Sequence, residues 1–341
     1  MSRQLAHFAG ASTPARCRRS PPWGLHRRRR PTRRLRPPRV RHLCASGRWR
    51  RLRRGIYVTS HDLARAEEEG RRYQLECLAI LVALDRPAAA LSHLSAARLS
   101  GLLWRGTSDA DVRLTDPEHN RRGRGFRVTR APLDATEIRT LGAFRLTTPA
   151  RTLIDWAREG PLEGAVVAMD AGLLARKVGP EQLVEAAARA RRWPGGPRAA
   201  RALSLTDGRA ESPLETRGRL RIVSAGLPAP ELQVEIRTGG RLIAVVDAWF
   251  DEAAVAVEFD GRVEYTDPWR ERSPERVLWE EKRREDELRA LDIGVVRIAD
   301  ADLGARWPRA ERRLQALLAS PGPAIRRFDT TARARGRQRS G

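Results

Sequence analysis

Acidic side chains interrupt two apolar runs within residues 241–261, whose sequence is RLIAVVDAWFDEAAVAVEFDG. We interpret the runs as two strands of a hairpin whose two-residue turn is Asp251 and Glu252, which makes Asp247 and Glu258 diagonal neighbours. Because successive side chains of a strand point to opposite faces, this register places Asp247, Glu258 and Asp260 on one face of the sheet. The pattern therefore predicts a cluster of three carboxylates.

Such a cluster has a chemical consequence. Three carboxylates on one sheet face repel one another, and burying them costs free energy unless a cation or another partner compensates. Hard divalent ions take oxygen ligands, so the cluster indicates a magnesium-type site with Asp247 and Glu258 within reach of one ion. In the alternative interpretation, Asp251, Glu252 and Asp260 are ordinary turn residues, and Asp247 lies at a solvated strand end.

Length and charge predict two domains and a nucleic-acid partner. A chain of 341 residues is long enough for about two domains with apolar cores. Its formal net charge is +24; residues 1–54 hold eighteen Arg and no acidic residue, which leaves +6 for the remainder. Nucleic acid is the natural partner of so basic a chain.

Cysteine, histidine and hydropathy patterns exclude several classes of protein. Cys17, Cys44 and Cys77 are widely separated, so they indicate neither a disulfide framework nor a zinc knuckle and fit a reducing cytoplasm. No run of about 18 apolar residues and no apolar signal core occurs, so we expect a cytoplasmic protein without a membrane segment. The last histidine is His119, which excludes imidazole-dependent nuclease and zinc-hydrolase centres from the C-terminal half.

The N-terminal region combines an Arg- and Pro-rich arm with a basic segment. Residues 1–39 are expected to be disordered, either as an arm that binds DNA phosphates or as a mis-assigned start of the chain. In residues 40–58 we expect a short helix, a turn at Gly47 and one basic strand. The alternative for that strand is a solvated edge with Trp49 in the core. The candidate phosphate-binding residues of this segment are Arg48, Arg50, Arg51, Arg53 and Arg54.

This basic segment resembles the wing of the winged-helix module of AbiEi-type antitoxin proteins, in which Gly-Arg-Trp leads to Arg-Gly-x-Tyr. The resemblance makes residues 40–60 a partial winged-helix segment. Residues 61–200 are expected to form a mixed α/β region, and their Thr-x-x-Arg-Thr-x-x-Asp motif, within residues 144–158, resembles the middle region of the same proteins. A partner toxin protein is therefore one candidate partner. A linker-like segment follows at residues 193–210.

The C-terminal third is predicted to form an α+β domain at residues 207–320. Ser212 and Glu215 form a capping-box pattern at the start of its first helix. The expected order is that helix, three antiparallel strands, a long charged helix, a short strand and a closing helix. Residues 321–341 are expected to be a basic disordered tail.

Four short motifs occur in order within residues 207–305: Glu-Ser-x-x-Glu, Gly-Leu-Pro-x-Pro-x-x-Gln, Val-Asp and Glu-x-Asp-Gly. They resemble a domain of the PD-(D/E)XK nuclease superfamily that is related to the very-short-patch repair endonucleases. The resemblance implies a restriction-endonuclease-like fold that hydrolyses DNA phosphodiester bonds with Mg²⁺ or Mn²⁺. It also implies that Asp247 and Glu258 are metal ligands, with Glu211 or Glu215 as the acid of the first helix.

One position departs from the pattern of the superfamily. The residue two places after the second acid is usually Lys, and here it is Asp260. Lys282 is the candidate replacement, because an ammonium group can lose its proton and orient a water molecule. Alternatively, Lys282 lies on a solvated helix face, paired with Asp286. Gln233 is a candidate for orienting a ligand or DNA, and Arg262 for contacting DNA phosphates.

Two functional hypotheses follow from the sequence. In the first, the protein is a metal-dependent DNA endonuclease. In the second, it is a DNA-binding regulator or antitoxin-like protein that retains the nuclease fold as a scaffold without turnover. A divalent ion bound through Asp247 and Glu258 would distinguish them, because only the enzyme requires it.

Overall fold

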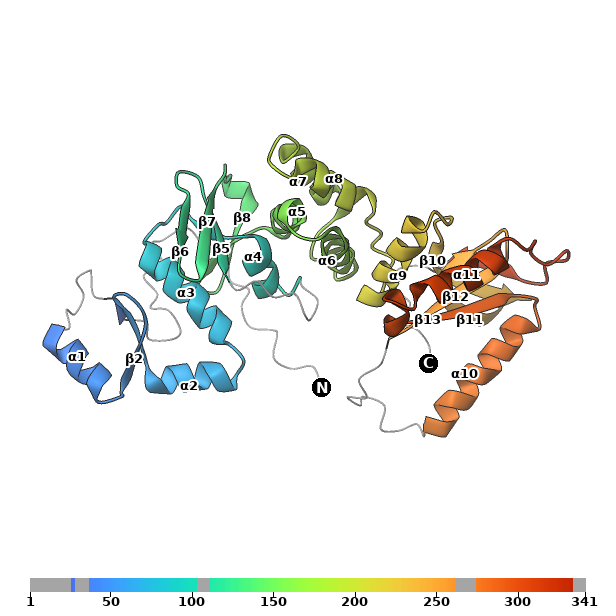
Figure 1. Ribbon diagram of the computed structural model, residues 1–341, viewed down its shortest axis with the longest axis horizontal. Helices are drawn as coiled ribbons and strands as arrows, with labels where there is room; N and C mark the ends of the chain where they lie inside the picture. The colour runs from blue at the N-terminus through green and yellow to red at the C-terminus, as the bar shows by residue number, and fades with distance from the viewer. Residues whose placement is uncertain (1–25, 28–36, 103–110, 262–273, 334–341) are drawn as a thin grey trace. The chain divides into compact units, whose positions relative to one another are not determined.

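The computed structural model describes residues 26–27, 37–102, 111–261 and 274–333. In this part of the chain the fold is mixed α/β, with eleven α-helices and three β-sheets (Figure 1). The chain divides into two compact units: unit 1 comprises residues 1–91, 114–133 and 138–146, and unit 2 comprises the remainder. None of the described helices combines the length and hydropathy that crossing a bilayer requires.

Unit 1 begins with a small antiparallel sheet in the order β1-β3-β2. Its strands are β1 (His26–Arg27), β2 (Trp49–Arg53) and β3 (Ile56–Thr59). Strands β2 and β3 form a hairpin, and helix α1 (Pro37–Ala45) precedes it. The single strand expected within residues 40–58 is therefore a hairpin, and that expectation was wrong. The chain reverses at Gly55, whose φ of +80° is readily accessible only to glycine.

Two helices pack on this hairpin. They are α2 (Ser60–Glu68), which is capped by the side chain of Thr59, and α3 (Arg72–Leu84). Together with β3 they bury an apolar cluster of Val58, Ala66, Leu75 and Leu78. The basic hairpin is thus fixed to the helices by its apolar face, and its arginines remain available on the surface.

A six-stranded sheet, largely within unit 1, has the order β6-β7-β5-β4-β9-β8. Strand β4 runs antiparallel to β5 and parallel to β9, so the sheet is mixed. The strands are β4 (Ala90–Leu91), β5 (Val112–Asp116), β6 (Arg121–Gly123), β7 (Phe126–Arg130), β8 (Ile138–Leu141) and β9 (Phe144–Thr147), with a short 3-10 turn η1 (Ala135–Glu137) before β8.

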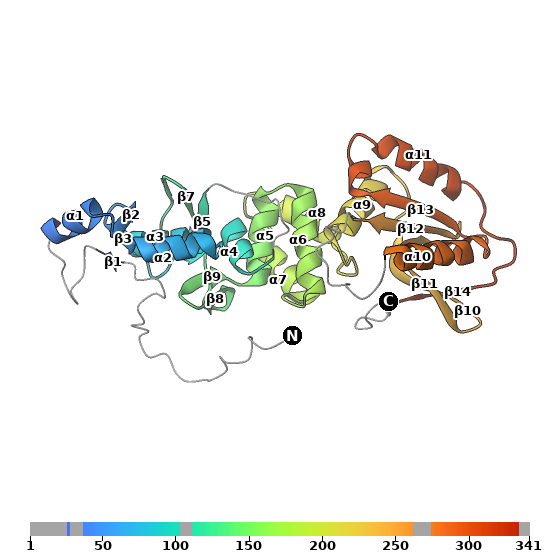
Figure 2. The same cartoon turned by 90° about the horizontal axis from the view of Figure 1, so that it is seen from below.

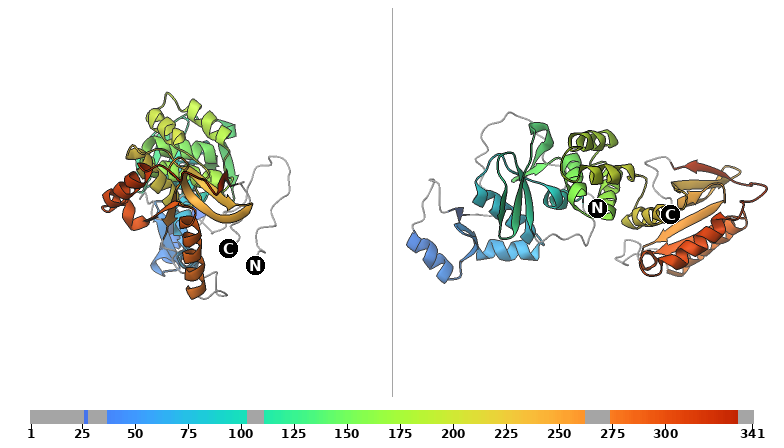
Figure 3. Two further views of the ribbon diagram at one scale, coloured as in Figure 1. Left: turned by 90° about the vertical axis from the view of Figure 1, so that its right-hand side faces the viewer. Right: turned by 45° about the horizontal axis from the view of Figure 1, so that its top comes forward.

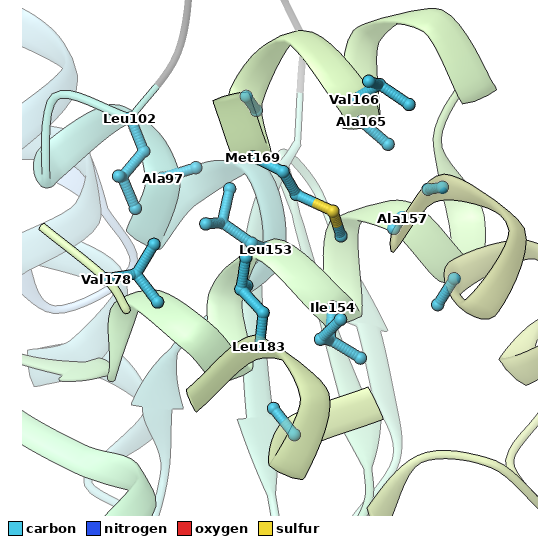
Figure 4. Packing of buried hydrophobic residues seen from close by; sticks show 14 of the residues in the cluster. Ala97, Leu102, Leu153, Ile154, Ala157, Ala165, Val166, Met169, Val178 and Leu183 are labelled. Carbon is cyan, nitrogen blue, oxygen red and sulfur yellow. The ribbon is translucent and has the colours of Figure 1, made fainter. Parts of the chain in front are cut away.

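The helical part of unit 2 is organised around one apolar core. Its helices are α4 (His93–Leu99), α5 (Pro149–Glu159), α6 (Leu162–Leu174), α7 (Pro180–Arg189) and α8 (Gly196–Ser204). Met169, Leu153 and Ile154 point into the centre of this core (Figure 4). The linker expected at residues 193–210 in fact contains α8, because its small residues Ala199 and Ala202 pack into the core.

The C-terminal part of unit 2 has the predicted order of elements from α9 to α11, and an additional strand, β14, follows them. They are α9 (Pro213–Ser224), β10 (Glu231–Thr238), β11 (Arg241–Phe250), β12 (Val255–Asp260), α10 (Pro274–Arg289), β13 (Gly294–Ala299), η2 (Asp300–Leu303), α11 (Trp307–Leu318) and β14 (Asp329–Ala332). Strands β10, β11 and β12 form an antiparallel meander, and β13 pairs parallel to β12 after the crossover through α10. The result is a five-stranded sheet in the order β13-β12-β11-β10-β14.

Helices cover both faces of this sheet. One core cluster joins Leu214 and Ile222 of α9 to Leu314 of α11, and the other contains Leu288 of α10. Helices α11 and α10 belong to these two different clusters, and Figure 2 shows both beside the strands of the sheet. The strands that carry Asp247 and Glu258 are therefore held in place by an apolar core on each face of the sheet.

Strand β14 corrects the expectation for residues 321–341. Within the described part of that range, up to residue 333, Asp329–Ala332 pairs antiparallel with β10 and forms one edge of the sheet (Figure 3, dark red). The basic composition of the range predicted a tail, but the short run Phe-Asp-Thr-Thr-Ala carries the β-prone residues that extend the sheet.

Candidate functional site

The β11–β12 hairpin places Asp247 and Glu258 opposite each other. Phe250 pairs with Val255, so the turn contains four residues where two were expected. The ladder ends one position before Asp247, and the next pair in the same register is Asp247 with Glu258. Because the expected and the observed turn both have an even number of residues, Asp247 and Glu258 lie on the same face of the sheet, as predicted. The two additional turn residues make Glu258 the direct neighbour of Asp247 and not its diagonal neighbour.

The Asp247 carboxylate lies where β11 and β12 stop pairing. Asp247 is 7% exposed, and its Oδ2 accepts a hydrogen bond from the backbone N–H of Phe259 at 2.9 Å. Its Oδ1 lies 3.3 Å from Nε2 of Gln233 on β10. The two contacts hold the carboxylate between the neighbouring strands.

Glu215 enters from helix α9. Ser212 caps this helix as predicted, because its Oγ accepts from the backbone N–H of Glu215 at 3.1 Å. The Glu215 carboxylate itself accepts from the backbone N–H of Glu211 at 2.8 Å and from Nε2 of Gln233 at 3.0 Å. Burial and the nearby Asp247 carboxylate raise the pKa of Glu215 to about 7.

Glu258 has positively charged neighbours on other elements. Its carboxylate lies 3.4 Å from a guanidinium nitrogen of Arg284 on α10 and 3.4 Å from Nε of Arg297 on β13. Burial raises the pKa of Glu258, the two arginines oppose that rise, and Asp247 adds to it. Asp247 is therefore the electrostatic neighbour of both other carboxylates.

Gln233 links these groups in an uncommon backbone conformation. Its φ is +54°, in the left-handed region that residues other than glycine rarely adopt. Its amide nitrogen contacts Glu215 and Asp247, and its Oε1 lies 3.3 Å from a guanidinium nitrogen of Arg333. Arg333 also pairs with Glu211 at 2.9 Å. Arg333 was not among the predicted site residues because it follows β14, in the segment expected to be a tail.

The remaining predicted residues lie outside this group of contacts. Asp260 is exposed at the end of β12 and Lys282 is exposed on α10, and neither side chain bonds to a described residue. Asp286, the helical partner considered for Lys282, instead lies 3.9 Å from Arg289. Arg262 falls outside the described residues.

Glu215, Asp247 and Glu258, hereafter the acidic cluster, have the donor chemistry that hard divalent cations require. The raised pKa values of Glu215 and Glu258 indicate that the groups around them compensate their charge incompletely. A divalent cation would lower both pKa values by favouring the carboxylates. Asp247, with Glu258 or Glu215, would hold such an ion, and the arginines beside Glu258 would compete with it.

The predicted phosphate-binding arginines lie on or beside the β2–β3 hairpin of unit 1, and Arg53 connects them to a second hairpin. A guanidinium nitrogen of Arg53 donates to the carbonyl oxygen of Arg124, in the β6–β7 turn, at 2.7 Å. The guanidinium also lies 5.4 Å from the centre of the Phe126 ring. Two basic hairpins therefore meet at Arg53.

The arginines of both hairpins are largely exposed to solvent. None of the exposed members forms an ion pair with a residue in the described part of the chain. These exposed members are Arg48, Arg50, Arg51 and Arg54 on the first hairpin, and Arg121, Arg122, Arg124, Arg127 and Arg130 on the second. The surface carries positive charge that no described carboxylate neutralises.

A further group of metal-ligand types occurs in unit 1, where ligand atoms of Asp116, Glu118 and His119 lie within 4.8 Å of one another. Arg86 already contacts both acids, at 2.8 Å from Asp116 and 2.5 Å from Glu118. The backbone N–H groups of Glu118 and His119 also donate to Asp116. The group is therefore a turn in which Arg86 already pairs with both acids.

A serine, a histidine and a glutamate are aligned in unit 2. Ser92 Oγ lies 2.8 Å from Nδ1 of His93, and Nε2 of His93 lies 3.4 Å from Glu159. Ser92 is 0% exposed, so no substrate can reach its hydroxyl. We assign these contacts to packing of α4 against α5.

No protein-family model matches the chain. Two uncharacterized proteins of Mycobacterium tuberculosis, MT2308 (strain CDC 1551 / Oshkosh) and Rv2248 (strain ATCC 25618 / H37Rv), are each 36% identical to it over 115 residues. The match covers 33% of the chain, and the chain spans 42% of the length of each relative. A crystal structure of the M. tuberculosis RV2827C protein is 18% identical, with a TM-score of 0.36 over 57% of the chain and 70% of that protein.

Proposed function

We propose that the protein is a metal-dependent endodeoxyribonuclease that hydrolyses phosphodiester bonds of DNA. The observation that carries the proposal is the acidic cluster, in which Asp247 is the shared electrostatic neighbour of Glu215 and Glu258. Buried carboxylates with raised pKa values are costly to the fold, and a catalytic role would explain why the protein retains them. The order of α9, the β10–β12 meander, α10 and β13 supports a restriction-endonuclease-like fold of the PD-(D/E)XK superfamily.

The residues of the acidic cluster would have separate roles. Asp247 and Glu258 would hold Mg²⁺ or Mn²⁺, which when bound activates water and neutralises charge that develops on the phosphate. Glu215, with a pKa of about 7, can accept a proton at its carboxylate near neutral pH. Gln233 donates to both Glu215 and Asp247, so it orients the two carboxylates toward each other.

DNA as substrate is supported by the basic hairpins of unit 1. Exposed arginines that have no described carboxylate partner are suited to the phosphate backbone, because each contact releases counterions from DNA. Arg53 holds the β2–β3 and β6–β7 turns together and so presents both sets of arginines on one body. This arrangement supports binding that is independent of base sequence.

A DNA-binding regulator or antitoxin-like protein without turnover is the second candidate. The observation that favours it is the pairing of Glu258 with Arg284 and Arg297, which occupies oxygens that a metal ion would need. The residue two places after Glu258 is also Asp260, where the superfamily usually has Lys. In this candidate the basic hairpins bind DNA, and a partner toxin protein is a further candidate partner.

A plasmid-cleavage assay on the full chain tests the proposal. Supercoiled DNA would be incubated with Mg²⁺, Mn²⁺ or EDTA and the wild type, Asp247→Asn, Glu258→Gln or Glu252→Gln. Glu252 is an exposed acid in the β11–β12 turn, so its variant is the matched control. We expect metal-dependent nicking by the wild type and by Glu252→Gln, and a loss of at least about 100-fold in the other two variants.

The same assay separates the two candidates. DNA that is bound but not cut with either metal, by any of the proteins, would exclude the nuclease and leave the regulator. Nicking that persists in Asp247→Asn at the wild-type rate would place the activity elsewhere or in a contaminant. Circular dichroism of each variant would establish that lost activity reflects lost chemistry and not an unfolded chain.

A further inference from the structure

A surface cavity lies in unit 2 beside the edge strand β13 and helix α11. Its volume is about 490 Å³, and Asp302 is the carboxylate in its lining. Oδ2 of Asp302 accepts a hydrogen bond from the backbone N–H of Ala299 at 3.0 Å. Four of the seven lining residues are arginines, so the cavity carries net positive charge: Arg297, Arg306, Arg309 and Arg313.

The start of α11 adds to this positive charge. Arg306 is its N-cap residue, Arg309 is in its first turn, and no acidic residue occurs there. The N-terminus of a helix carries partial positive charge, so two cations at this end are unfavourable unless an anion offsets them. The backbone N–H groups of Trp307 and Arg309 already donate to carbonyl oxygens at 3.0 Å. An anion would therefore be held mainly by the arginine side chains.

Two of the four arginines already have partners. Arg297 lies 3.4 Å from Glu258 and 3.1 Å from Glu285, and Arg313 donates to the Val295 carbonyl oxygen at 3.1 Å. Arg306 and Arg309 are exposed and form no ion pair with a described residue. They are three residues apart, so they lie on the same side of the first helical turn. Two guanidinium groups therefore remain for a ligand.

We propose that this cavity binds a phosphate group of the DNA backbone. Guanidinium groups match the geometry of phosphate oxygens and donate two parallel hydrogen bonds. Arg297 both lines the cavity and contacts Glu258. A phosphate bound here would therefore belong to a DNA strand that passes beside the acidic cluster. The assignment to DNA rests on the proposed function, whereas binding of a phosphate group does not.

Two charge reversals on α11 test the site. Arg309→Glu changes a residue of the cavity, and Arg312→Glu changes an exposed arginine of the same helix that does not line it. Both variants lower the net charge equally, so a general loss of attraction would affect them equally. Binding of a fluorescein-labelled duplex to the full chain would be measured by anisotropy in EDTA, across a series of KCl concentrations. Inorganic pyrophosphate would be titrated by calorimetry.

We expect Arg309→Glu to weaken DNA binding at least about tenfold more than Arg312→Glu, and Arg309→Gln to lower the salt slope by about 0.9. Pyrophosphate binding that is lost in Arg309→Glu alone, with DNA binding unchanged, would support the phosphate site but assign it to a free phosphate compound. Equal effects of the two reversals on both probes would overturn the inference. EDTA prevents cleavage, so a failure of the nuclease proposal leaves this test intact.

Discussion

The acidic cluster couples stability to pH, most strongly through Glu215. Its pKa in the folded protein, about 7, lies above its ordinary value of 4.5 because burial and the charge of Asp247 disfavour the carboxylate. The folded protein therefore binds this proton more tightly than the unfolded chain does. The free energy of unfolding is highest when Glu215 is protonated, and it falls as pH rises from about 4.5 to 7.

We predict that Glu215→Gln removes this part of the pH dependence. The amide stays neutral, and its oxygen can still accept from Gln233 and from the backbone of Glu211. Between pH 5 and 8 the free energy of unfolding of the wild type should fall by up to roughly 3 kcal/mol more than that of the variant. Urea unfolding followed by circular dichroism measures the difference, with Glu252→Gln as the exposed control. A variant that loses as much stability as the wild type would contradict the prediction.

Strand β14 supports the acidic cluster indirectly, through Gln233. It pairs with β10 from Val234 to Arg237, next to Gln233, and the backbone N–H of Arg333 donates to the Gln233 carbonyl oxygen at 2.9 Å. The Arg333 side chain then reaches Glu211 and Gln233. The strand thus supports the conformation of Gln233 from the sheet edge.

We predict that truncation after Phe328 leaves the chain less stable than truncation after Arg333 does. The first removes β14 and Arg333 but keeps the edge-to-face contact of Phe328 with Trp249, whose ring centres are 5.9 Å apart. Each lost hydrogen bond contributes about 1 kcal/mol, so the loss should be several kcal/mol. Thermal unfolding of the two truncated chains measures it. Equal melting temperatures would show that β14 contributes nothing.

The order of the elements from α9 to α11 could be predicted because local signals are strong there. The side chain of Ser212 marks the start of α9, and apolar runs mark β11 and β12. The turn between those strands was harder, because two-residue and four-residue turns both keep Asp247 and Glu258 on one face. Only pairing across the sheet, between Phe250 and Val255, decides between them.

The neighbours of the acidic cluster could not be predicted, because they come from distant segments. Arg284, Arg297 and Arg333 lie on or beside three different elements, and each is one of many arginines in the sequence. Composition cannot indicate which of them contacts an acid. The φ of +54° at Gln233 was also hidden, since a glutamine within a β-prone run predicts an ordinary strand residue.

At the scale of the whole molecule, a buried ion pair joins the helical part of unit 2 to its sheet. Asp170 on α6 accepts from Arg219 on α9 at 3.1 Å, from Thr216 Oγ1 at 2.9 Å and from the backbone N–H of Asp207 at 2.7 Å. Asp170 is 1% exposed and Arg219 is 7% exposed. A half-buried pair, Glu163 with Arg217 at 3.0 Å, joins the same two helices. The first pair is more deeply buried, and Arg217 of the second pair also contacts Asp300.

We predict that Asp170→Ala costs about 3–5 kcal/mol, because it leaves the Arg219 charge buried without its main acidic partner. Glu163→Ala should cost less than about 1 kcal/mol, since Glu163 is partly solvated and Arg217 keeps Asp300 as an acidic partner. Differential scanning calorimetry of the full chain measures both losses. If the pair couples the two parts of unit 2, Asp170→Ala should also split one thermal transition into two, as the helices and the sheet begin to unfold independently. Similar losses in the two variants, without splitting, would mean that apolar packing of α6 on α9 supplies the coupling, and that the buried charges contribute specificity and not stability.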